Sequence, residues 1–435
     1  MKQQDTTGAG AWRSIVIIVF LVILSMVDRN SINLMIAPIR KSFGINDLQF
    51  GLLQGPAFAV FFLLGSVAMG WLVDKYSNRW LIYAGVMLWS IATIASGLSG
   101  SFTALLIARC FVGLGESVLQ PAGWNIVTKL FPADRLSTAM GALSAGSTVG
   151  VAVSFILSGY LISKAAQGPL MPLPFLEHVQ PWQWVFLAAG VPGLLIALLI
   201  FLLPPGSGKA NLANPNNSGK LSGFIRENRA FLFCHFAGFG LLSVMVNGAA
   251  AWGPEYLTRT HQLNAKNIGL LFGFIGVPLG VGGVLVAGWL VDRVFKKGHY
   301  DAHLSHFVIR ALLVAVIGFL GFTFDRQVII PLVCFGLIQF IQPFAGVAGA
   351  SLQVSTPEQY RSRISAVFIM WYNGAGMMLG PSFVALLSNV FGHGKLGMAI
   401  AVNYLILGSI AAVLLWAGRR YASASYQRYN LNRSS

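Results

Sequence analysis

Long apolar segments recur along the whole chain and are separated by shorter polar stretches. A helix needs about 20 predominantly apolar residues to cross the hydrocarbon core of a bilayer. The pattern therefore predicts an all-α membrane protein in which twelve helices cross the bilayer. The predicted spans are residues 13–38, 48–73, 81–99, 102–129, 137–163, 182–203, 230–254, 266–291, 304–324, 327–352, 362–388 and 396–418.

The composition agrees with lipid as the outer solvent of the folded chain. Of the 435 residues, 56% are hydrophobic and only 10% are charged, whereas soluble domains carry about 25% charged residues. The first apolar run, residues 14–27, lacks a cleavage site of small residues, and apolar sequence resumes after Asp28, Arg29 and Asn30. We therefore expect a retained first helix rather than a signal peptide.

Basic residues are distributed unequally among the segments that join the predicted spans. With the N-terminus inside, 20 of the 29 Lys and Arg residues fall on cytoplasmic segments and seven on the opposite side. Because cytoplasmic loops carry an excess of Lys and Arg, we expect a multi-pass protein of the cell inner membrane with both termini in the cytoplasm. The same bias explains the net charge of +16, so we expect no nucleic-acid partner.

The segment 204–228 interrupts the series of apolar runs. It is rich in Gly, Pro, Asn and Ser, lacks an apolar period, and is typical of a flexible linker. It separates a predicted N-terminal bundle, residues 1–203, from a predicted C-terminal bundle, residues 229–435. The motifs GWLVDK and GWLVDR occur once in each part at an offset of 218 residues. This internal repeat predicts two related bundles of six helices.

The repeated motif resembles the loop signature of the major facilitator superfamily, G-x-L-a-D-r-x-G-r-r. Its first copy runs from Gly70 to Arg79, with Ser77 in place of the usual glycine, and its second copy is abbreviated. The resemblance covers essentially the whole chain and implies the twelve-helix major facilitator fold. It also implies a loop that latches the two halves in the outward-facing state. The residues implied in this latch are Gly70, Asp74, Lys75, Arg79, Gly288, Asp292 and Arg293.

Other motifs are similar to the Spinster-like branch of that superfamily. They are Val27-Asp28-Arg29 in the first predicted span and Gly115-Glu116-Ser117, preceded by Arg109, in the fourth. The proton-coupled sugar-acid symporters of the same superfamily also carry an Asp-Arg pair in the first helix and a Glu in the fourth. The resemblance therefore leaves two interpretations open. One is a symporter of a small organic anion, and the other is an exporter or flippase of a lysophospholipid or sphingoid-type lipid.

Charged residues inside the predicted spans are the candidates for coupling. Asp28, Arg29, Arg109 and Glu116 each face a cost of about 2.5–3.5 kcal/mol at the bilayer centre, so they should line an aqueous cavity and pair there. At about 1.5 Å per residue, Arg29 and Glu116 lie roughly 24 and 20 Å from the inner ends of their helices, and this similar depth allows them to pair. We expect Arg29 and Arg109 to bind the anion and Glu116 or Asp28 to carry a proton. Alternatively, Arg109 near its helix end merely snorkels.

The C-terminal half offers neutral polar and aromatic side chains instead. At the 218-residue offset, Asp28 and Arg29 correspond to Val246 and Asn247, and Glu116 corresponds to Cys334. Ion coupling should therefore reside in the N-terminal half. Candidate substrate contacts, which alternatively only join helices, are Asn33, Asn247, Gln339, Trp371, Tyr372 and Asn373.

Signatures of enzymes, metals and cofactors are missing from the sequence. The three cysteines lie singly in apolar segments, and there is no G-x4-G-K-[ST] nucleotide loop. His299, His303 and His306 have ligand-like spacing, but no acid or cysteine cluster joins them, so a solvated loop is the preferred interpretation. We expect a monomeric transporter, not an enzyme, without metal or cofactor. Its expected partners are a small organic anion or a lipid as substrate, protons and the surrounding membrane lipids.

Overall fold

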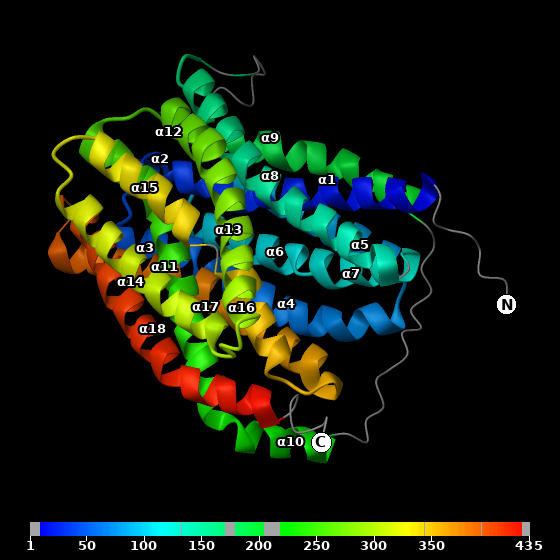
Figure 1. Ribbon diagram of the computed structural model, residues 1–435. Helices are drawn as coiled ribbons and strands as arrows, with labels where there is room; N and C mark the ends of the chain where they lie inside the picture. The colour runs from blue at the N-terminus through cyan, green and yellow to red at the C-terminus, as the bar shows by residue number, and fades with distance from the viewer. Residues whose placement is uncertain are drawn as a thin grey trace. The chain divides into compact units, whose positions relative to one another are not determined.

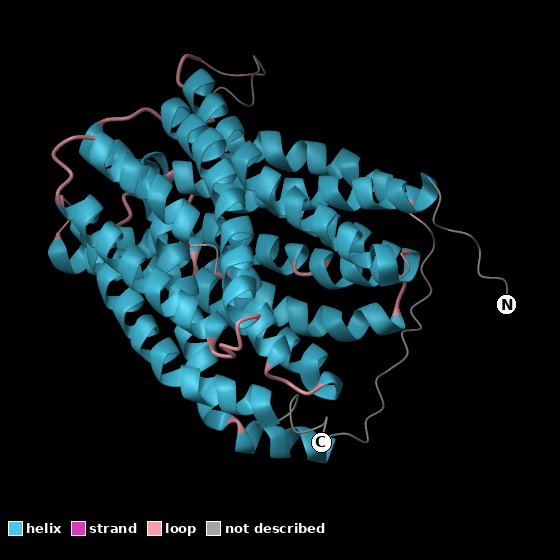
Figure 2. Ribbon diagram, viewed as in Figure 1, coloured by secondary structure: helices cyan, strands magenta, loops and turns pink. Residues whose placement is uncertain are grey.

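A computed structural model of the protein describes residues 9–131, 133–168, 170, 179–203, 218–342, 344–392 and 394–428. Helices make up most of this described part, and it contains no strand (Figure 2). The chain divides into two compact units by its internal contacts. Unit 1 comprises Met1–Asn211 and Gln262–Val277, and unit 2 comprises Leu212–His261 and Pro278–Ser435.

Unit 1 contains α1 to α9, which are drawn from blue through cyan to the first green in Figure 1, and a short piece from the second half of the chain. Its closest helix pairs are α1 with α8, α5 with α9, and α6 with both α4 and α5. The helices are α1 (Ala9–Ser31), η1 (Ile32–Leu34), α2 (Ile36–Phe43), α3 (Asp47–Gln54), α4 (Pro56–Lys75), α5 (Asn78–Gly97), α6 (Phe102–Glu116), α7 (Leu119–Leu130), α8 (Ala133–Ala165), α9 (Pro181–Ile196), η3 (Ala197–Leu202), α12 (Ala265–Leu271) and the π-helical η5 (Phe272–Gly276).

Unit 2 is organised around α11, which packs along both α17 and α18, while α18 also packs along α14. Arg419 of α18 donates a hydrogen bond of 2.8 Å to Asp301, just before α14. Partial burial raises the pKa of Asp301, but hydrogen bonds from Ser305 and Arg419 outweigh this effect and lower the pKa overall. The helices are α10 (Ser218–Glu227), α11 (Arg229–His261), α13 (Val277–Phe295), α14 (Ala302–Thr323), α15 (Ile329–Ile341), α16 (Ala345–Val354), α17 (Glu358–Phe391) and α18 (Leu396–Tyr426).

Eleven of the described helical segments are long and apolar enough to cross a membrane. The remaining predicted span, residues 327–352, consists of the apolar helix α15 followed by α16. Large apolar side chains face outward, and Leu195 and Val390 are 68% and 70% exposed. A surface of this kind needs lipid as its solvent. The prediction of an all-α membrane protein with the twelve-helix pattern is therefore confirmed.

The fourth predicted span, residues 102–129, corresponds to the candidate span Phe102–Val127, in which the helix has a local interruption. It divides into α6, which ends at Glu116, and α7, which begins at Leu119. At the break, the Ser117 hydroxyl donates to the Leu114 carbonyl at 2.6 Å. The short polar stretch Glu116-Ser117 lies between long apolar runs, so hydropathy alone does not reveal the break.

The tenth predicted span is broken as well. Its first piece, α15, ends at Ile341, and the sequence places a proline at position 343, where the ring removes a backbone donor and disfavours continued helix. The carbonyl of Ile341 accepts a hydrogen bond of 2.9 Å from Arg310 of α14. This contact satisfies a carbonyl that the end of the helix would otherwise leave free. The expectation of one continuous helix over 327–352 is therefore wrong.

Glycines let the helices of unit 1 approach closely beside Glu116. A Cβ atom on Gly113 would collide with the Phe58 carbonyl oxygen of α4, and one on Gly115 would lie 2.7 Å from the Trp89 backbone nitrogen of α5. Neither gap admits a methyl group without movement of a backbone. The last turn of α6, which carries Glu116, is therefore held directly against α4 and α5.

A short helix from the second half of the chain joins unit 1. A Cβ atom on Gly269 of α12 would collide with the Phe155 carbonyl oxygen of α8. This close crossing places Gln262–Val277 in unit 1, although the residues belong by order to the predicted C-terminal bundle 229–435. The predicted domain boundaries themselves stay a prediction.

Part of the predicted linker is helical. Residues 204–217 lie outside the described part, but Ser218–Glu227 forms α10. Leu221, Phe224 and Ile225 recur at helical spacing there, and Phe224 is buried with its ring 5.7 Å from that of Tyr360. The expectation of irregular structure throughout 204–228 is therefore wrong for the ten residues of α10.

His299 lies in an exposed loop, as the sequence predicted, but the same expectation is wrong for His303 and His306. His303 and His306 belong to α14. His303 is buried, and its ring lies 5.1 Å from that of Phe295. The structure places these histidines in a helix because their rings pack against aromatic neighbours, and among the described residues no group of three or more metal-ligating side chains comes together.

The close approach of α5 and α6 generates a stability prediction. Gly115→Ala should lower the unfolding free energy by about 1–3 kcal/mol, because the added methyl group forces the α5 backbone away. Gly141→Ala is the matched control. No atom lies within 4 Å of its added Cβ, so the better helix propensity of alanine should leave stability equal or higher. Thermal unfolding of the purified proteins in detergent measures both changes. Equal melting temperatures for the two variants would contradict the close packing.

Candidate functional site

A buried ion pair joins α1 to α6 inside unit 1. The Arg29 Nη2 and Nε atoms donate hydrogen bonds to Glu116 Oε2 at 2.7 and 3.2 Å. The Ser25 hydroxyl, one helical turn before Arg29, donates a third hydrogen bond to the same oxygen at 2.8 Å. The side chain of Glu116 has no exposed surface, whereas that of Arg29 is 23% exposed. The pairing expected from helix depth is thus present in the structure.

The second acid and the second arginine lie beside this pair but do not form a matching one. Asp28 and Arg109 are both 1% exposed. The Arg109 Nη1 atom donates to the backbone carbonyl of Asp28 at 3.4 Å. Among the described residues, neither carboxylate oxygen of Asp28 has a hydrogen-bond partner. Arg109 is therefore buried within the bundle and does not snorkel.

Aromatic rings of α4 cover the arginines. The guanidinium of Arg29 lies 4.9 Å from the ring centres of both Phe58 and Phe62. Arg109 lies 5.4 Å from the ring centre of Phe58. Cation–π contacts of desolvated arginines are worth about 2 kcal/mol. The rings therefore stabilise the two cations without neutralising them.

Three contributors to this site were missed by sequence reasoning. Ser25 precedes Arg29 by four residues and so lies on the same face of α1. Phe58 and Phe62 are also four residues apart, and they face the arginines together. The spacing of Ser25 from Arg29 was the one local signal available. No sequence signal brings α4 to the arginines, because that contact depends on the packing of α4 against α6.

Candidate substrate contacts in unit 2 gather where α11 crosses α17. The Trp371 indole donates to the Phe236 carbonyl at 2.9 Å, and the Asn247 side chain donates to the Ser243 carbonyl at 2.9 Å. Tyr372 and Asn373 follow Trp371 on α17 and are half-buried. The Trp371 contact joins α17 to α11, and the Asn247 contact stays within α11. The role of Asn247, Trp371, Tyr372 and Asn373 in binding stays a prediction.

Two further candidates lie elsewhere. Gln339 of α15 accepts a hydrogen bond from Gln342 at the broken end of that helix. Asn33 is buried in η1 of unit 1, where its side chain accepts a hydrogen bond from Gln54. Their hydrogen bonds thus place neither Gln339 nor Asn33 at the crossing of α11 and α17.

The predicted latch residues lie at helix ends. Arg79 of α5 donates to the Phe201 carbonyl and lies 5.1 Å from the Phe201 ring centre. Arg293 and Asp292 are exposed at the end of α13, with Arg293 5.3 Å from the Trp289 ring centre. Lys75 is exposed at the end of α4, and Gly288 lies in α13. Gly70 and Asp74 belong to α4, but their side chains are outside the described part. The latch stays a prediction.

The fold and the buried charges together define a membrane transporter of a known family. Residues 18–381 match the family model of the Major Facilitator Superfamily. This match covers most of the chain, so the protein belongs to the major facilitator superfamily of transporters, and the resemblance inferred from the loop motifs is confirmed.

Individual relatives share most of the length of the chain. The D-galactonate transporter of Escherichia coli O6:H1 is 24% identical over 434 residues, covering 94% of this chain and 96% of the relative. Protein spinster homolog 1 of Xenopus laevis is 24% identical over 415 residues, covering 89% and 76%. A crystal structure of a bacterial homologue of the human lysosomal transporter Spinster, in an inward-facing and unoccupied conformation, superposes with a TM-score of 0.78 at 20% identity, covering 97% and 98%. The structural likeness shows a shared fold.

The buried pair yields a prediction for stability. Arg29→Gln leaves the Glu116 carboxylate buried without its cation and should cost about 3–5 kcal/mol. Adding Glu116→Gln removes the stranded charge, so the double variant should unfold at a higher temperature than Arg29→Gln alone. The measurement is a double-mutant cycle of thermal unfolding in detergent.

Glu227 supplies the control for this cycle, because its partner is Arg428 at 3.6 Å on the surface of unit 2. Arg29→Gln combined with Glu227→Gln should show additive effects. Strict additivity in the Arg29–Glu116 cycle as well would mean that the pair contributes no coupling energy.

Proposed function

We propose that the protein carries a small organic anion together with a proton across the membrane by alternating access. The observation behind this proposal is the cluster of two arginines and two acids buried in unit 1. Arg29 keeps 23% of its side chain exposed, whereas Asp28, Arg109 and Glu116 are each 1% exposed. A carboxylate that reaches the cluster therefore meets Arg29 first, and its two oxygens suit the planar fork of a guanidinium.

Arg29 links the anion to the proton in this proposal. A bound carboxylate competes with Glu116 for the Nε and Nη2 hydrogens of Arg29. When Arg29 turns to the substrate, Glu116 keeps the Ser25 hydroxyl as a donor but loses the cation beside it. An uncompensated buried charge costs several kcal/mol, so Glu116 takes up a proton. Anion and proton then occupy unit 1 together.

Asp28 is the second candidate for the proton. Its carboxyl oxygens have no hydrogen-bond partner among the described residues, and Arg109 bonds its backbone carbonyl. Burying a neutral acid costs far less than burying an isolated charge. In this proposal Asp28 therefore holds a proton while Glu116 is paired with Arg29, and the two acids differ in when they are protonated.

The membrane and the orientation are also part of the proposal. The excess of Lys and Arg on segments that include both chain ends supports a location in the inner membrane with the N- and C-termini in the cytoplasm. The galactonate transporter among the relatives supports sugar acids as the first carboxylates to test. We propose that the transporting form is a monomer.

A lipid substrate is the second candidate, and the similarity to a sphingosine-1-phosphate transporter of Danio rerio, 24% identical over 295 residues, favours it. Arg29 would bind the phosphate of a lysophospholipid with the same two donors. Counterflow into proteoliposomes separates the candidates, because a sugar acid such as D-galactonate should exchange in one case and a labelled lysophospholipid in the other.

Glu116→Gln tests the coupling. The amide mimics the protonated acid, so the variant should still exchange substrate in counterflow but should lose accumulation driven by an inward-directed proton gradient. Arg29→Ala should lose both activities, because the accessible cation is then missing from the cluster. Arg29→Lys should keep part of the binding, since a point charge replaces a bidentate fork. Uptake into proteoliposomes, with and without an imposed pH gradient, measures each activity.

Asp28→Asn is the companion variant in this experiment. Glu116→Gln could accumulate substrate as well as the unmodified protein does. If Asp28→Asn then loses accumulation, the proton is carried by Asp28. Accumulation that survives in both variants would exclude proton coupling through this cluster.

The proposed latch generates a separate prediction. If Asp74, Lys75 and Arg79 hold the cytoplasmic side closed, Asp74→Asn should speed inward opening and reduce net transport without lowering the melting temperature. Labelling rates of single-cysteine probes on the cytoplasmic side measure the opening. Glu227→Gln, which removes a surface acid outside both loop motifs, is the control and should label like the unmodified protein. Unchanged labelling in Asp74→Asn argues against the latch.

A further inference from the structure

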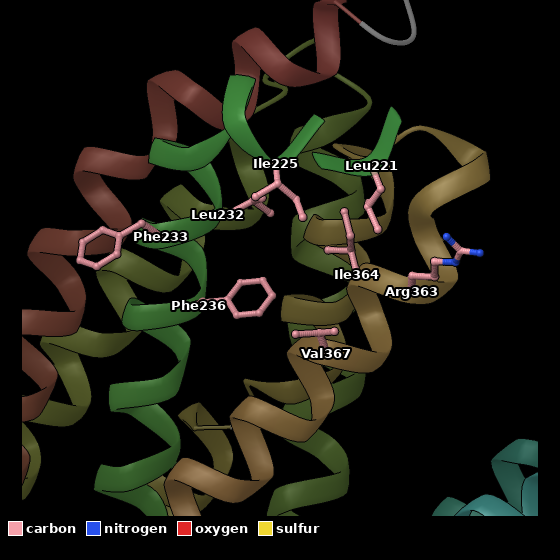
Figure 3. Close-up of a pocket in the computed structure, with 8 residues that line it drawn as sticks. All are labelled: Leu221, Ile225, Leu232, Phe233, Phe236, Arg363, Ile364 and Val367. Atoms are coloured by element: carbon pink, nitrogen blue, oxygen red, sulfur yellow. The ribbon is translucent and has the colours of Figure 1, made fainter. Parts of the chain in front are cut away.

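An apolar pocket lies at one end of unit 2, outside the charged cluster of unit 1. Its volume is about 370 Å³, within the range of small-molecule sites of about 300–1,000 Å³. Leu221 and Ile225 of α10, Phe236 of α11, and Ile364 and Val367 of α17 line it with almost entirely apolar surface. Figure 3 shows side chains of all three helices pointing into one space.

The pocket lies at the level where the spans begin. The candidate membrane spans of α11 and α17 start at Arg229 and Gln359. Phe236 and Val367 follow these starts by two turns, or roughly 10–12 Å at 1.5 Å per residue. The wall formed by α10 is fixed by the contact of Phe224 with Tyr360. The pocket therefore reaches from the polar boundary of the bilayer into its apolar layer.

Arginines lie on each of the three helices that line the pocket. Arg363 lines the pocket with its stem, and Figure 3 shows its guanidinium pointing away from the apolar residues. Arg226 and Arg229 are exposed on α10 and at the start of α11. Within the described part, none of these three arginines has a carboxylate partner, and Glu227 is paired with Arg428 at 3.6 Å. Arg363 thus borders the apolar space, and Arg226 directly follows the lining residue Ile225 in sequence.

We propose that this pocket binds an anionic phospholipid of the cytoplasmic leaflet, with one acyl chain in the pocket and the phosphate against Arg363 and its neighbouring arginines. The choice of leaflet rests on the orientation proposed above. An acyl chain suits an apolar space that opens at membrane depth, where water-soluble ligands are scarce. The arginines add the preference for a negative headgroup, since each basic residue near an anionic surface contributes about 1 kcal/mol. The lipid would tie α10 to α11 and α17.

Binding of defined lipids to the purified full-length protein tests the proposal. Native mass spectrometry in detergent should show phosphatidylglycerol bound at least about fivefold more tightly than phosphatidylcholine, the ratio that corresponds to one arginine near the headgroup. The combined variant Arg226→Gln/Arg363→Gln should abolish this preference. Arg420→Gln, which removes an exposed arginine of α18, is the matched control and should retain it.

Filling the pocket tests the acyl chain. Val367→Trp and Ile225→Trp, which enter the space from different walls, should each reduce bound phosphatidylglycerol by about tenfold or more. Val413→Trp is the control, because Val413 is 65% exposed on α18 and its replacement should change nothing. Two variants are made because either one could misfold and become unusable. Size-exclusion chromatography detects misfolding.

Three results would overturn the proposal. The first is equal binding of phosphatidylglycerol and phosphatidylcholine by the unmodified protein. The second is unchanged lipid binding in both tryptophan variants. The third is displacement of the lipid by glycerol phosphate, which would indicate a site for a soluble anion. Lipid binding is measured without any transported solute. The test of this pocket therefore remains valid even if the proposed transport activity is not found.

Discussion

The ion pair between Arg29 and Glu116 is the interaction on which the account of unit 1 depends. Two charges taken out of water cost several kcal/mol each, and their attraction offsets this only with good geometry and additional hydrogen bonds. Arg29 donates twice to Glu116 Oε2 and Ser25 donates to the same oxygen, whereas Oε1 has no hydrogen-bond partner among the described residues. Arg29 keeps 23% of its side chain exposed, and in the proposed function this exposed part is where the solute reaches the pair. Removing or moving the Arg29 guanidinium should therefore destabilise the ionised form of Glu116.

The surrounding backbone is built to hold this pair. Gly113 and Gly115 bring the last turn of α6 against α4 and α5, and α6 ends at Glu116 itself. Ser117 and Val118, between α6 and α7, keep right-handed helical dihedrals, so the interruption after Glu116 is local. The carboxylate of Glu116, the end of α6 and the close contacts of α6 with α4 and α5 therefore lie in one buried region. The tenth span is also broken, but the carbonyl of Ile341 at its break is satisfied by Arg310.

The sequence allowed the spans, the family and the charged cluster to be predicted, each for a physical reason. Apolar runs of about 20 residues are typical of membrane-spanning helices, and charges are rare enough inside them that Asp28, Arg29, Arg109 and Glu116 are conspicuous. The breaks in the fourth and tenth spans were not predictable from hydropathy, because the short polar stretches at Glu116-Ser117 and Gln342-Pro343 lie between long apolar runs. The helix α10 was missed because the Gly- and Asn-rich composition before Ser218 obscures its short apolar face. The aromatic cover of the arginines depends on tertiary packing, which no local pattern contains.

If substrate and Glu116 compete for Arg29 as proposed, the anion and the proton enter together, and a direct measurement of proton movement tests this coupling. Proteoliposomes in weakly buffered medium, without an imposed pH gradient, are given an inward gradient of D-galactonate while a pH electrode follows the medium. The account predicts that the medium becomes alkaline as solute enters, that Arg29→Ala abolishes the signal, and that Glu116→Gln exchanges solute without it. Entry of labelled solute with no change in the pH of the medium would contradict the account.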